Sequence, residues 1–590
     1  MIKHGLAFKF LVPAGALLFA IEAGIPARAQ APEDLSHGVA RISLMEGEVT
    51  VRRGDSGEWV AGVINAPLMT DDRVATGQNS RAEVQFDTAN VLRIGGNAEV
   101  HLAQLESGRF HLEIAHGTVT FRMLRQSRAE IELNTPSVSV RPAREGVFRV
   151  SVSEGGESEI TARSGDVEVF TPQGTQWIYN GQTMMARGNS ADPEFQIVNA
   201  TQEDDWDRLN EIRDHVAQSN NSAQYVPPGV TGTEDLDAAG TWVNVPPYGY
   251  VWRPTGVAAG WAPYRNGRWV WVNWYGWTWV SSDTWGWAPY HYGRWFFDAR
   301  WGWSWYPGGL GVSAYWSPAQ VGFFGYGGGV GIGVGVGFGF GNIGWVPLAP
   351  YETFRPWWGA AYAGGLNRGV SITNANVTAL YRNARVSNGI SGMAAGDFTA
   401  GRFANVQRVS AGQMQSAGMI SGRLPLNPSA ASRRFSDHVP ANLPHSAGDQ
   451  LSRGAVTPGR AGASAQSQAG YHRFGEPGAA SQNARPQQAA AGSKAAGQRQ
   501  GSLQRFGEPG SSQGASRNDR PSASQGGSGG WKSFGTSGSS TGGRQPYNPP
   551  QSGSGSGNGQ QQRSAPATRS TPASGSRPAG GGHPAPKGGR

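Results

Sequence analysis

Tryptophan is concentrated in one segment of this chain, and that segment repeats. Residues 240–358 hold 18 of the 22 tryptophans. Because three separate landmarks recur at one and the same spacing, the segment is expected to fold as copies of one small unit. The landmarks are Gly-Trp-Ala-Pro-Tyr at 260–264 and 286–290, Gly-Arg-Trp at 267–269 and 293–295, and Gly-Trp-x-Trp at 276–279 and 302–305.

Each copy of the repeat predicts two strands joined by turns. Two tryptophans stand two positions apart near the end of each copy, as Trp277 and Trp279 do in the first. Side chains alternate between the two faces of a strand, so both rings of such a pair lie on one face. Residues 248–252 resemble a partial earlier copy that is displaced by one position. We therefore predict a small antiparallel β-repeat domain over residues 240–360.

The repeated aromatic rings allow two interpretations. They form either a surface that stacks on sugars or cationic groups, or the core of sheets too thin to be filled by aliphatic residues. Arg268 and Arg294 each precede a repeated tryptophan and are expected to stack on neighbouring rings, with an acidic ligand as the alternative. The candidate ligand-binding residues of the aromatic surface are Trp261, Tyr264, Trp269, Trp287, Tyr290 and Trp295.

Residues 36–200 have a different pattern, in which short segments alternate apolar and polar residues. This period of two indicates strands with one buried face. Gly, Asn and Asp between the segments indicate turns, and no long helix interrupts them. We therefore predict an all-β sandwich, barrel or solenoid. The clearest strands lie at residues 48–52, 82–86, 117–121, 129–133 and 166–170.

Residues 201–217 have the pattern of a helix that connects the two β regions. Apolar or long side chains recur at spacings of three and four between Trp206 and Val216. Thr201 is the predicted N-cap, and the acidic residues that follow it are favoured by the positive end of the helix dipole.

The C-terminal third of the chain is low in complexity. Residues 385–590 are rich in Gly, Ser, Ala, Gln and Pro, which predicts a disordered tail. From residue 451 onward there are 16 Lys/Arg and 3 Asp/Glu, a charge of +13; the whole chain carries +8, so the rest carries −5. Such a tail is expected to associate with anionic envelope surfaces in a salt-sensitive way. Its sparse aromatic residues argue against nucleic acid as a partner.

A short motif recurs inside this tail. Phe474-Gly-Glu-Pro-Gly478 returns at residues 506–510. A repeated motif with an aromatic residue is either a docking element or a duplicated spacer, and the sequence leaves both open.

Residues 1–29 have the layout of a secretory signal peptide. Lys3 and Lys9 precede an apolar run, and Ala27-Arg-Ala29 fits a cleavage site. The run is shorter than the about 20 residues that span a bilayer, although an uncleaved anchor is the alternative. The chain has no cysteine, which excludes disulfides, thiol catalysis, cysteine-zinc sites and a lipid-modified cysteine. We expect a periplasmic, cell-surface or secreted protein of a Gram-negative type of envelope, with no membrane span after signal cleavage.

The order of motifs in residues 38–190 resembles the FecR-type periplasmic domain. One departure lies at residues 140–148, where Val-Arg-Pro-Ala-Arg-Glu-Gly-Val-Phe stands in place of the usual Val-Arg-Gly-Thr-x-Phe. The matching motifs are Gly47-Glu-Val49, Gly57-Glu-Trp59, Asp72-Arg-Val74, Thr76-Gly77, Arg81-Ala-Glu83, Thr135-Pro136, Phe148-Arg-Val150, Gly165-Asp-Val-Glu-Val169 and Gly181-Gln182.

This resemblance implies a β-rich sensing or interaction module of the envelope. FecR-type regulators carry a cytoplasmic anti-sigma segment ahead of a membrane span, whereas here a signal peptide is predicted in that place. The Trp-rich stretch is similar to an uncharacterised envelope domain family often found after FecR-like modules. The residues that carry this second likeness are Gly249-Tyr-Val-Trp-Arg-Pro254, Gly276-Trp-Thr-Trp-Val280, the run from Trp285 to Trp295, and Gly344-Trp-Val-Pro-Leu348.

Motifs of catalysis are missing from the sequence. It contains no GxSxG, HExxH or P-loop pattern. Asp71-Asp72 and Asp204-Asp205 fall in a turn and at a helix start, where acidic residues are common. His111 and His116 would point to opposite faces of one strand, so together with His101 they do not predict a zinc site. We expect no catalytic residue, no metal site and no cofactor, although two distant carboxylates remain able to form a glycosidase site.

These observations favour a non-enzymatic interaction or scaffold protein of the envelope. Its expected partner is envelope polysaccharide or peptidoglycan, or an envelope protein. The first alternative is a sensory component that works with a membrane partner, and the second is a glycan-processing enzyme.

Overall fold

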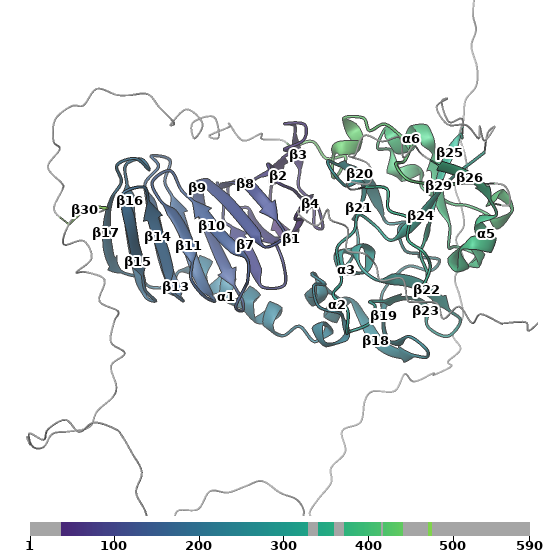
Figure 1. Cartoon of the computed structure of the whole chain (residues 1–590), viewed down its shortest axis with the longest axis horizontal. Coiled ribbons are helices and arrows are strands. Elements are labelled where there is room, and N and C mark those ends of the chain that lie inside the picture. Colours follow the sequence, from purple (N-terminus) through teal and green to yellow (C-terminus); the bar gives the residue numbers. More distant parts are fainter. Residues whose placement is uncertain (1–36, 328–339, 359–370, 415–416, 441–469, 475–590) are drawn as a thin grey trace, which may run out of the picture. The chain divides into compact units, whose positions relative to one another are not determined.

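The computed structural model describes residues 37–327, 340–358, 371–414, 417–440 and 470–474, all of which belong to one compact unit (Figure 1). The predicted mainly β fold is confirmed. No helix in these described ranges is long and apolar enough to cross a membrane. The predicted signal peptide, residues 1–29, lies outside them.

Residues 40–199 form a sandwich of two sheets that share one long strand, β9 (Arg109–Met123). Neighbouring strands are antiparallel except for β9 and β10, which are parallel. The first sheet has the order β3 (Trp59–Ala61), β2 (Val49–Arg52), β5 (Arg73–Thr76), β8 (Glu99–Glu106), β9, β10 (Glu130–Asn134), β11 (Ser139–Pro142), β14 (Val167–Thr171) and β15 (Gly174–Ile178).

The second sheet closes the other side of the sandwich. An aliphatic core built from residues of both sheets holds them together. Its order is β4 (Pro67–Leu68), β1 (Ala40–Glu46), β6 (Arg81–Gln85), β7 (Asn90–Ile94), β9, β12 (Gly146–Val152), β13 (Ser158–Ser164), β16 (Gln182–Arg187), β17 (Glu194–Asn199) and β30 (His472–Arg473).

Strand β9 passes from one sheet to the other at Gly117. Its first half pairs with β8 and β10, and its second half pairs with β7 and β12. Gly117 has φ +90°, and a Cβ atom there would lie 2.3 Å from the Cβ of Ala98. Only glycine fits this crossing, because other residues add both a steric clash and backbone strain.

The five predicted strands of this region are all present, as β2, β6, β9, β10 and β14. The departure from the FecR pattern at residues 140–148 falls on the connection between the sheets. Strand β11 ends the first-sheet segment at Pro142, and β12 begins in the second sheet at Gly146.

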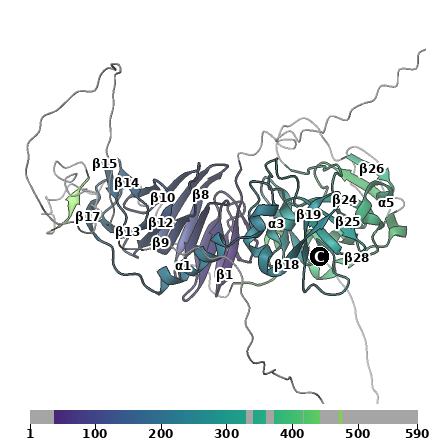
Figure 2. The same cartoon turned by 90° about the horizontal axis from the view of Figure 1, so that it is seen from below.

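Helix α1 (Asp205–Gln218) follows the sandwich and lies along its second sheet (Figure 2). Its N-cap is Asp204, which forms a capping box with Asp207, so the prediction of Thr201 was wrong. The side chain of Trp206 donates to the Thr120 hydroxyl, 2.9 Å away. The helix therefore does more than connect, since it covers the outer face of a sheet.

The aliphatic residues of α1 face outward, against the usual arrangement of an amphipathic helix. Leu209, Ile212 and Val216 are 39%, 62% and 45% exposed. The outer face of the second sheet is lined by arginines, so Asp207 and Asn210 of the helix are buried against it instead. Ion pairs in both directions join the helix to this sheet. The contacts are Arg93 and Arg122 with Asp214, Arg149 and Arg163 with Asp207, and Arg213 with Glu83.

The Trp-rich domain begins with short helical turns (η1, Ser222–Tyr225; η2, Thr233–Asp235; α2, Leu236–Ala239) and continues as three equivalent hairpins. Each hairpin places one tryptophan directly opposite another across the strand pair. The segment predicted as a partial earlier copy is the second strand of a complete first hairpin. The hairpins are β18 (Gly240–Val245) with β19 (Gly249–Pro254), β20 (Gly267–Val272) with β21 (Gly276–Ser281), and β22 (Arg294–Asp298) with β23 (Gly302–Tyr306).

The glycine that opens each hairpin makes room for the facing tryptophan ring. A Cβ atom at Gly240 or Gly267 would lie 2.4 or 2.7 Å from the ring of Trp252 or Trp279. Gly293 stands in the same relation to the third hairpin's facing ring, at 2.7 Å. The repeated glycine therefore permits close packing of ring on backbone.

The Trp-rich domain extends to residue 440, which corrects two predicted boundaries. We predicted that it ends at residue 360 and that the tail begins at residue 385. Residues between 371 and 421 instead contribute four strands to a six-stranded sheet. Their apolar residues are spaced between glycines and serines and pack into the tryptophan core, as Phe398 and Ile420 do. The order of the sheet is β26 (Ser371–Ala375), β29 (Ala417–Ser421), β24 (Val321–Tyr326), β25 (Asn342–Pro347), β27 (Ser391–Ala394) and β28 (Gln407–Arg408).

Short helices complete this domain: α3 (Trp287–His291), α5 (Val377–Leu380) and α6 (Ala395–Thr399), with 3-10 turns η3 (Arg382–Arg385), η4 (Phe403–Asn405), η5 (Ala411–Met414) and η6 (Ala431–Arg433). Beyond residue 440, the structure describes only residues 470–474 of the predicted tail.

Candidate functional site

The six residues predicted as an aromatic binding surface lie inside the Trp-rich domain. Five are at most 1% exposed, and the sixth, Trp261, is half-buried. They pack ring against ring in one cluster, with Trp269 and Trp345 at 5.7 Å and Tyr264 and Tyr290 at 4.8 Å between centroids. The burial of five of these rings matches their interpretation as a core, and only Trp261 keeps part of its surface exposed.

The two repeat arginines stack on aromatic rings, as predicted, but on rings outside the repeat. The Arg268 guanidinium lies 5.7 Å from the ring centroid of Phe403, and that of Arg294 lies 5.7 Å from Phe354. Arg268 also forms an ion pair of 2.7 Å with Asp437.

The middle hairpin joins the two domains through its two faces. Its tryptophans enter the aromatic core, whereas Val270, Val272 and Val280 belong to the aliphatic core of the sandwich. Alternation along a strand sends these two sets of side chains in opposite directions. The middle hairpin therefore contributes side chains to both cores.

A buried arginine reinforces the junction beside it. Arg41 of β1 is fully buried and reaches two carboxylates of the Trp-rich domain, Glu234 and Asp235, each at 2.7 Å. Burial alone would lower the pKa of Arg41, but the two carboxylates raise it above its ordinary value. Burial also raises the pKa of Glu234, against the opposing effect of Arg41.

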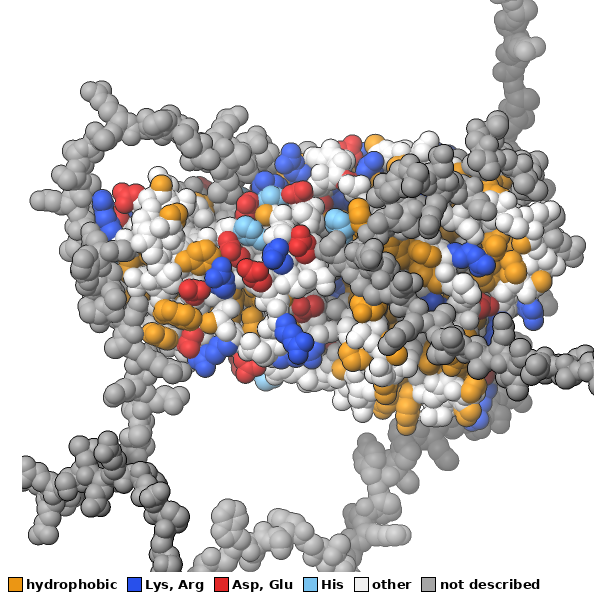
Figure 3. Space-filling model, in the orientation of Figure 1, with side chains coloured by type: hydrophobic (Ala, Val, Ile, Leu, Met, Phe, Trp, Pro, Cys, Tyr) orange, Lys and Arg blue, Asp and Glu red, His pale blue; other side chains and the backbone are white. Residues whose placement is uncertain are grey.

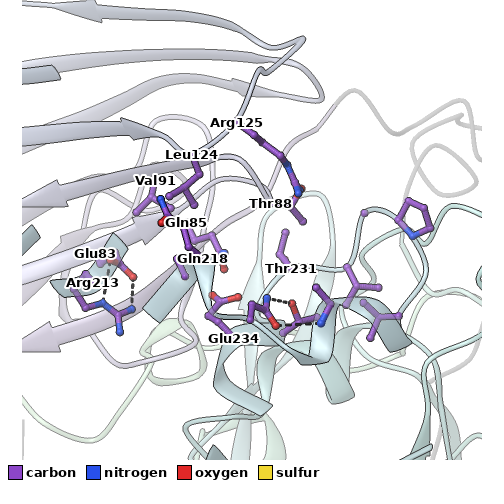
Figure 4. Close-up of a pocket in the computed structure, with 18 of the residues that line it drawn as sticks. Glu83, Gln85, Thr88, Val91, Leu124, Arg125, Arg213, Gln218, Thr231 and Glu234 are labelled. Atoms are coloured by element: carbon purple, nitrogen blue, oxygen red, sulfur yellow. Dashed lines mark hydrogen bonds and ion pairs between the residues drawn. The ribbon is translucent and has the colours of Figure 1, made fainter. Parts of the chain in front are cut away.

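A pocket of about 620 Å³ opens next to this ion pair, between the second sheet, α1 and the start of the Trp-rich domain (Figure 4). We call it the junction pocket. Its volume lies within the range typical of small-molecule sites. Its lining mixes charged groups, amides and hydroxyls with a short apolar wall; the labelled residues are Glu83, Gln85, Thr88, Val91, Leu124, Arg125, Arg213, Gln218, Thr231 and Glu234.

The carboxylates of the pocket are already engaged by arginines. Glu83 accepts from Arg213 at 2.6 Å, from Arg93 at 2.9 Å and from Ser43 at 2.8 Å. Burial would raise its pKa, but the two arginines outweigh burial and lower it to about 2. The pocket therefore contains one carboxyl with a lowered pKa and one, Glu234, with a raised pKa, both held in ion pairs.

His101, His111 and the buried acid Asp72 have structural partners. His101 lies 2.8 Å from Glu113, and His111 lies 3.5 Å from Glu132. No group of three potential metal ligands is found among the residues that the structure describes. Asp72 is buried and accepts from the backbone of Gly54 and Met69, which closes its turn.

Comparison with known families gives each domain a relative. Residues 72–168 match the FecR protein family. The chain carries a FecR-type domain. Residues 233–352 match a family of unknown function (DUF6600), a range that contains the three hairpins. Both predicted resemblances are therefore confirmed.

Comparison with individual proteins adds little. No curated protein matches the chain. Two crystal structures described as a candidate anti-sigma factor from Parabacteroides distasonis ATCC 8503 are 16% and 17% identical to it, each with a TM-score of 0.19. The match covers 22% of this chain and 59% of theirs, so the chain spans little more than half of their length. A TM-score this low supports no structural argument.

Sequence reasoning missed the junction pocket and the arginine beside it. The one signal was Glu83, a charged residue within a strand of the FecR motif Arg81-Ala-Glu83. Arg41 and Glu234 lie far apart in the chain, and nothing local indicates that they meet.

Proposed function

We propose that this chain is a non-enzymatic sensing and interaction protein of the cell envelope, with the junction pocket as its ligand site. The observation that carries the proposal is that both domains build this pocket, beside the ion pair of Arg41. The FecR family is regulatory and typically periplasmic or membrane-associated, which supports such a role.

The lining of the junction pocket favours an uncharged, hydroxyl-rich ligand. Gln85, Gln218 and Thr231 supply amide and hydroxyl groups that both donate and accept hydrogen bonds. Arg125, exposed at the pocket, adds a charged donor. A saccharide unit of peptidoglycan or of an envelope polysaccharide has matching chemistry. In this proposal the sugar binds at the junction pocket, and the buried tryptophans hold the domain together.

The pocket lies between the two domains, so ligand binding there can affect how they contact each other. A ligand that contacts the second sheet, α1 and residues 226–234 favours the arrangement in which the domains are joined. The exposed apolar stripe on α1 lies on the element that lines the pocket. In this proposal the stripe binds an envelope protein partner, and α1 couples that binding to binding of the ligand in the pocket.

Calorimetric titration of the full chain with soluble disaccharide-peptide fragments of peptidoglycan and with neutral oligosaccharides tests the proposal. We expect saturable binding that Arg125→Ala weakens by about tenfold, as removal of a charged hydrogen bond does. Arg128→Ala is the matched control, since Arg128 is equally an exposed arginine but does not line the pocket.

Two results would contradict the proposal. Equal loss of affinity in both arginine variants would place binding on general surface charge. Mass spectrometry of the fragments after incubation should show them intact, and cleaved products would support a glycan-processing enzyme instead.

A further inference from the structure

Part of the tail forms an added strand on the sandwich. Residues 472–473 make up β30, which pairs antiparallel with the last strand of the second sheet, β17; Arg473 lies opposite Glu194, and His472 opposite Phe195. The other neighbour of β17 is β16, so among the described residues β30 alone covers its outer edge (Figure 1). Uncovered edges are common sites for peptides that bind as an extra strand.

Side chains on both sides of β30 fix this strand to its place. Phe474 is 5% exposed, lies 4.5 Å from the ring of Phe195 and belongs to the sandwich core. The Tyr471 ring lies 4.0 Å from the Arg187 guanidinium. Arg473 pairs with Asp192 and Glu194, each at 3.7 Å. An apolar anchor and two charge contacts thus accompany the backbone pairing.

Arg473 and Phe474, which supply the ion pairs and the apolar anchor, belong to the motif that recurs in the tail. Arg473-Phe-Gly-Glu-Pro-Gly478 returns further along the tail as Arg505-Phe-Gly-Glu-Pro-Gly510. The two positions that supply the anchor and the ion pairs are identical in both copies. Leu503 and Gln504 replace Tyr471 and His472 in the second copy.

We propose that the outer edge of β17 is a docking site for this repeated motif, and that residues 503–506 are its second occupant. Backbone pairing does not depend on side chains, Phe506 supplies the same anchor, and Arg505 meets the same two carboxylates. Leu503 has no aromatic face for Arg187, so the first copy binds more tightly. In this proposal the two copies compete for one edge, and the repeated motif is a docking element and not a spacer.

The absence of cysteine makes a crosslinking test direct, because any disulfide must join introduced residues. The full chain is prepared with Glu194→Cys and one partner: Arg473→Cys, Arg505→Cys or, as a control outside the motif, Arg517→Cys. Each pair is oxidised mildly, with and without Phe474→Ala. Mass spectrometry then measures the crosslinked fraction, summed over products within and between chains, and circular dichroism confirms folding.

The expected pattern is a dominant 194–473 crosslink and, in the Phe474→Ala background, a 194–505 crosslink about tenfold above that of the 194–517 control. Truncation of the buried Phe474 is expected to weaken docking of the first copy by more than tenfold, which is enough to let the second copy bind. A 194–505 yield equal to the control in that background would overturn the proposal. So would a 194–473 yield no higher than the control in the unaltered background. Neither result depends on a ligand of the junction pocket.

Discussion

The two domains of this chain solve the same packing problem with different chemistry. The sandwich has an aliphatic core, and a network of arginines and carboxylates fixes α1 to its outer face. The Trp-rich domain has an aromatic core. On the face shown in Figure 3, charged side chains gather over the sandwich and apolar side chains over the Trp-rich domain.

The polar groups inside the two domains differ in the same way. Buried indole N–H groups of the Trp-rich domain donate mostly to backbone carbonyls, as Trp252 does to Leu236 and Trp305 to Tyr292. These indole bonds join neutral groups, whereas the polar contacts that hold α1 on the sandwich are ion pairs. Removal of one partner is therefore expected to cost far more in the charged network than in the neutral one.

Arg41→Met is expected to have the largest effect, because it breaks the ion pair that joins the domains. Glu234 and Asp235 would lose their shared cation while Glu234 stays largely buried, and loss of one partner of a buried ion pair costs about 3–5 kcal/mol. Urea unfolding followed by tryptophan fluorescence measures this loss of stability, and the signal reports mainly on the Trp-rich domain because most of the tryptophans lie there.

Arg81→Met serves as its control. Arg81 pairs with Glu46 near the surface, where the side chains are 30% and 55% exposed, and such a pair contributes about 1 kcal/mol or less. Similar losses in the two variants would mean that the Arg41 pair is no stronger than a surface contact.

The stability of the two domains is expected to depend on pH in different ranges. His291 is buried between Trp287 and Trp316, and burial lowers its pKa to about 3. Between pH 7 and 5 the unfolded chain gains a proton at this residue and the folded chain does not, so the free energy of unfolding falls by about 2 kcal/mol. Glu83, with its pKa lowered to about 2, stays ionised in both states over this range; its contribution is lost only below about pH 4.5.

His291→Gln should remove that pH dependence, as measured by urea unfolding at pH 7 and pH 5. His215→Gln is the matched control, since His215 is exposed on α1. An unchanged difference between the two pH values in His291→Gln would show that another group causes it.

Local patterns predicted much of this fold. The period of two located the sandwich strands, and the constant spacing of the repeat located the hairpins, because both signals depend on neighbours in sequence. The orientation of α1 was not predictable in this way. Its apolar stripe is exposed because the sheet beneath it presents Arg93 and Arg149, and the outward direction of those residues follows only from the strand pairing.

The proposed ligand site shows the same limit more strongly. Repetition of tryptophan drew attention to rings that are core, because a repeat maintains packing as readily as it maintains a surface. The junction pocket leaves no repeat and no motif, since its walls come from segments near residues 83–93, 124–125 and 213–234. Only the folded arrangement brings them together.

The smallest predicted effect compares hairpins within the aromatic core itself. Trp269 in the middle hairpin and Trp295 in the third occupy equivalent positions, and both are fully buried. The Trp295 N–H donates to the Pro289 carbonyl at 2.8 Å, whereas the Trp269 N–H has no partner among the described residues. Replacement by phenylalanine removes similar ring area in both cases but leaves an unpaired carbonyl only at Pro289. Trp295→Phe should therefore destabilise the domain by about 1 kcal/mol more than Trp269→Phe in urea unfolding; equal losses would show that ring packing, and not indole hydrogen bonding, sets the stability of this core.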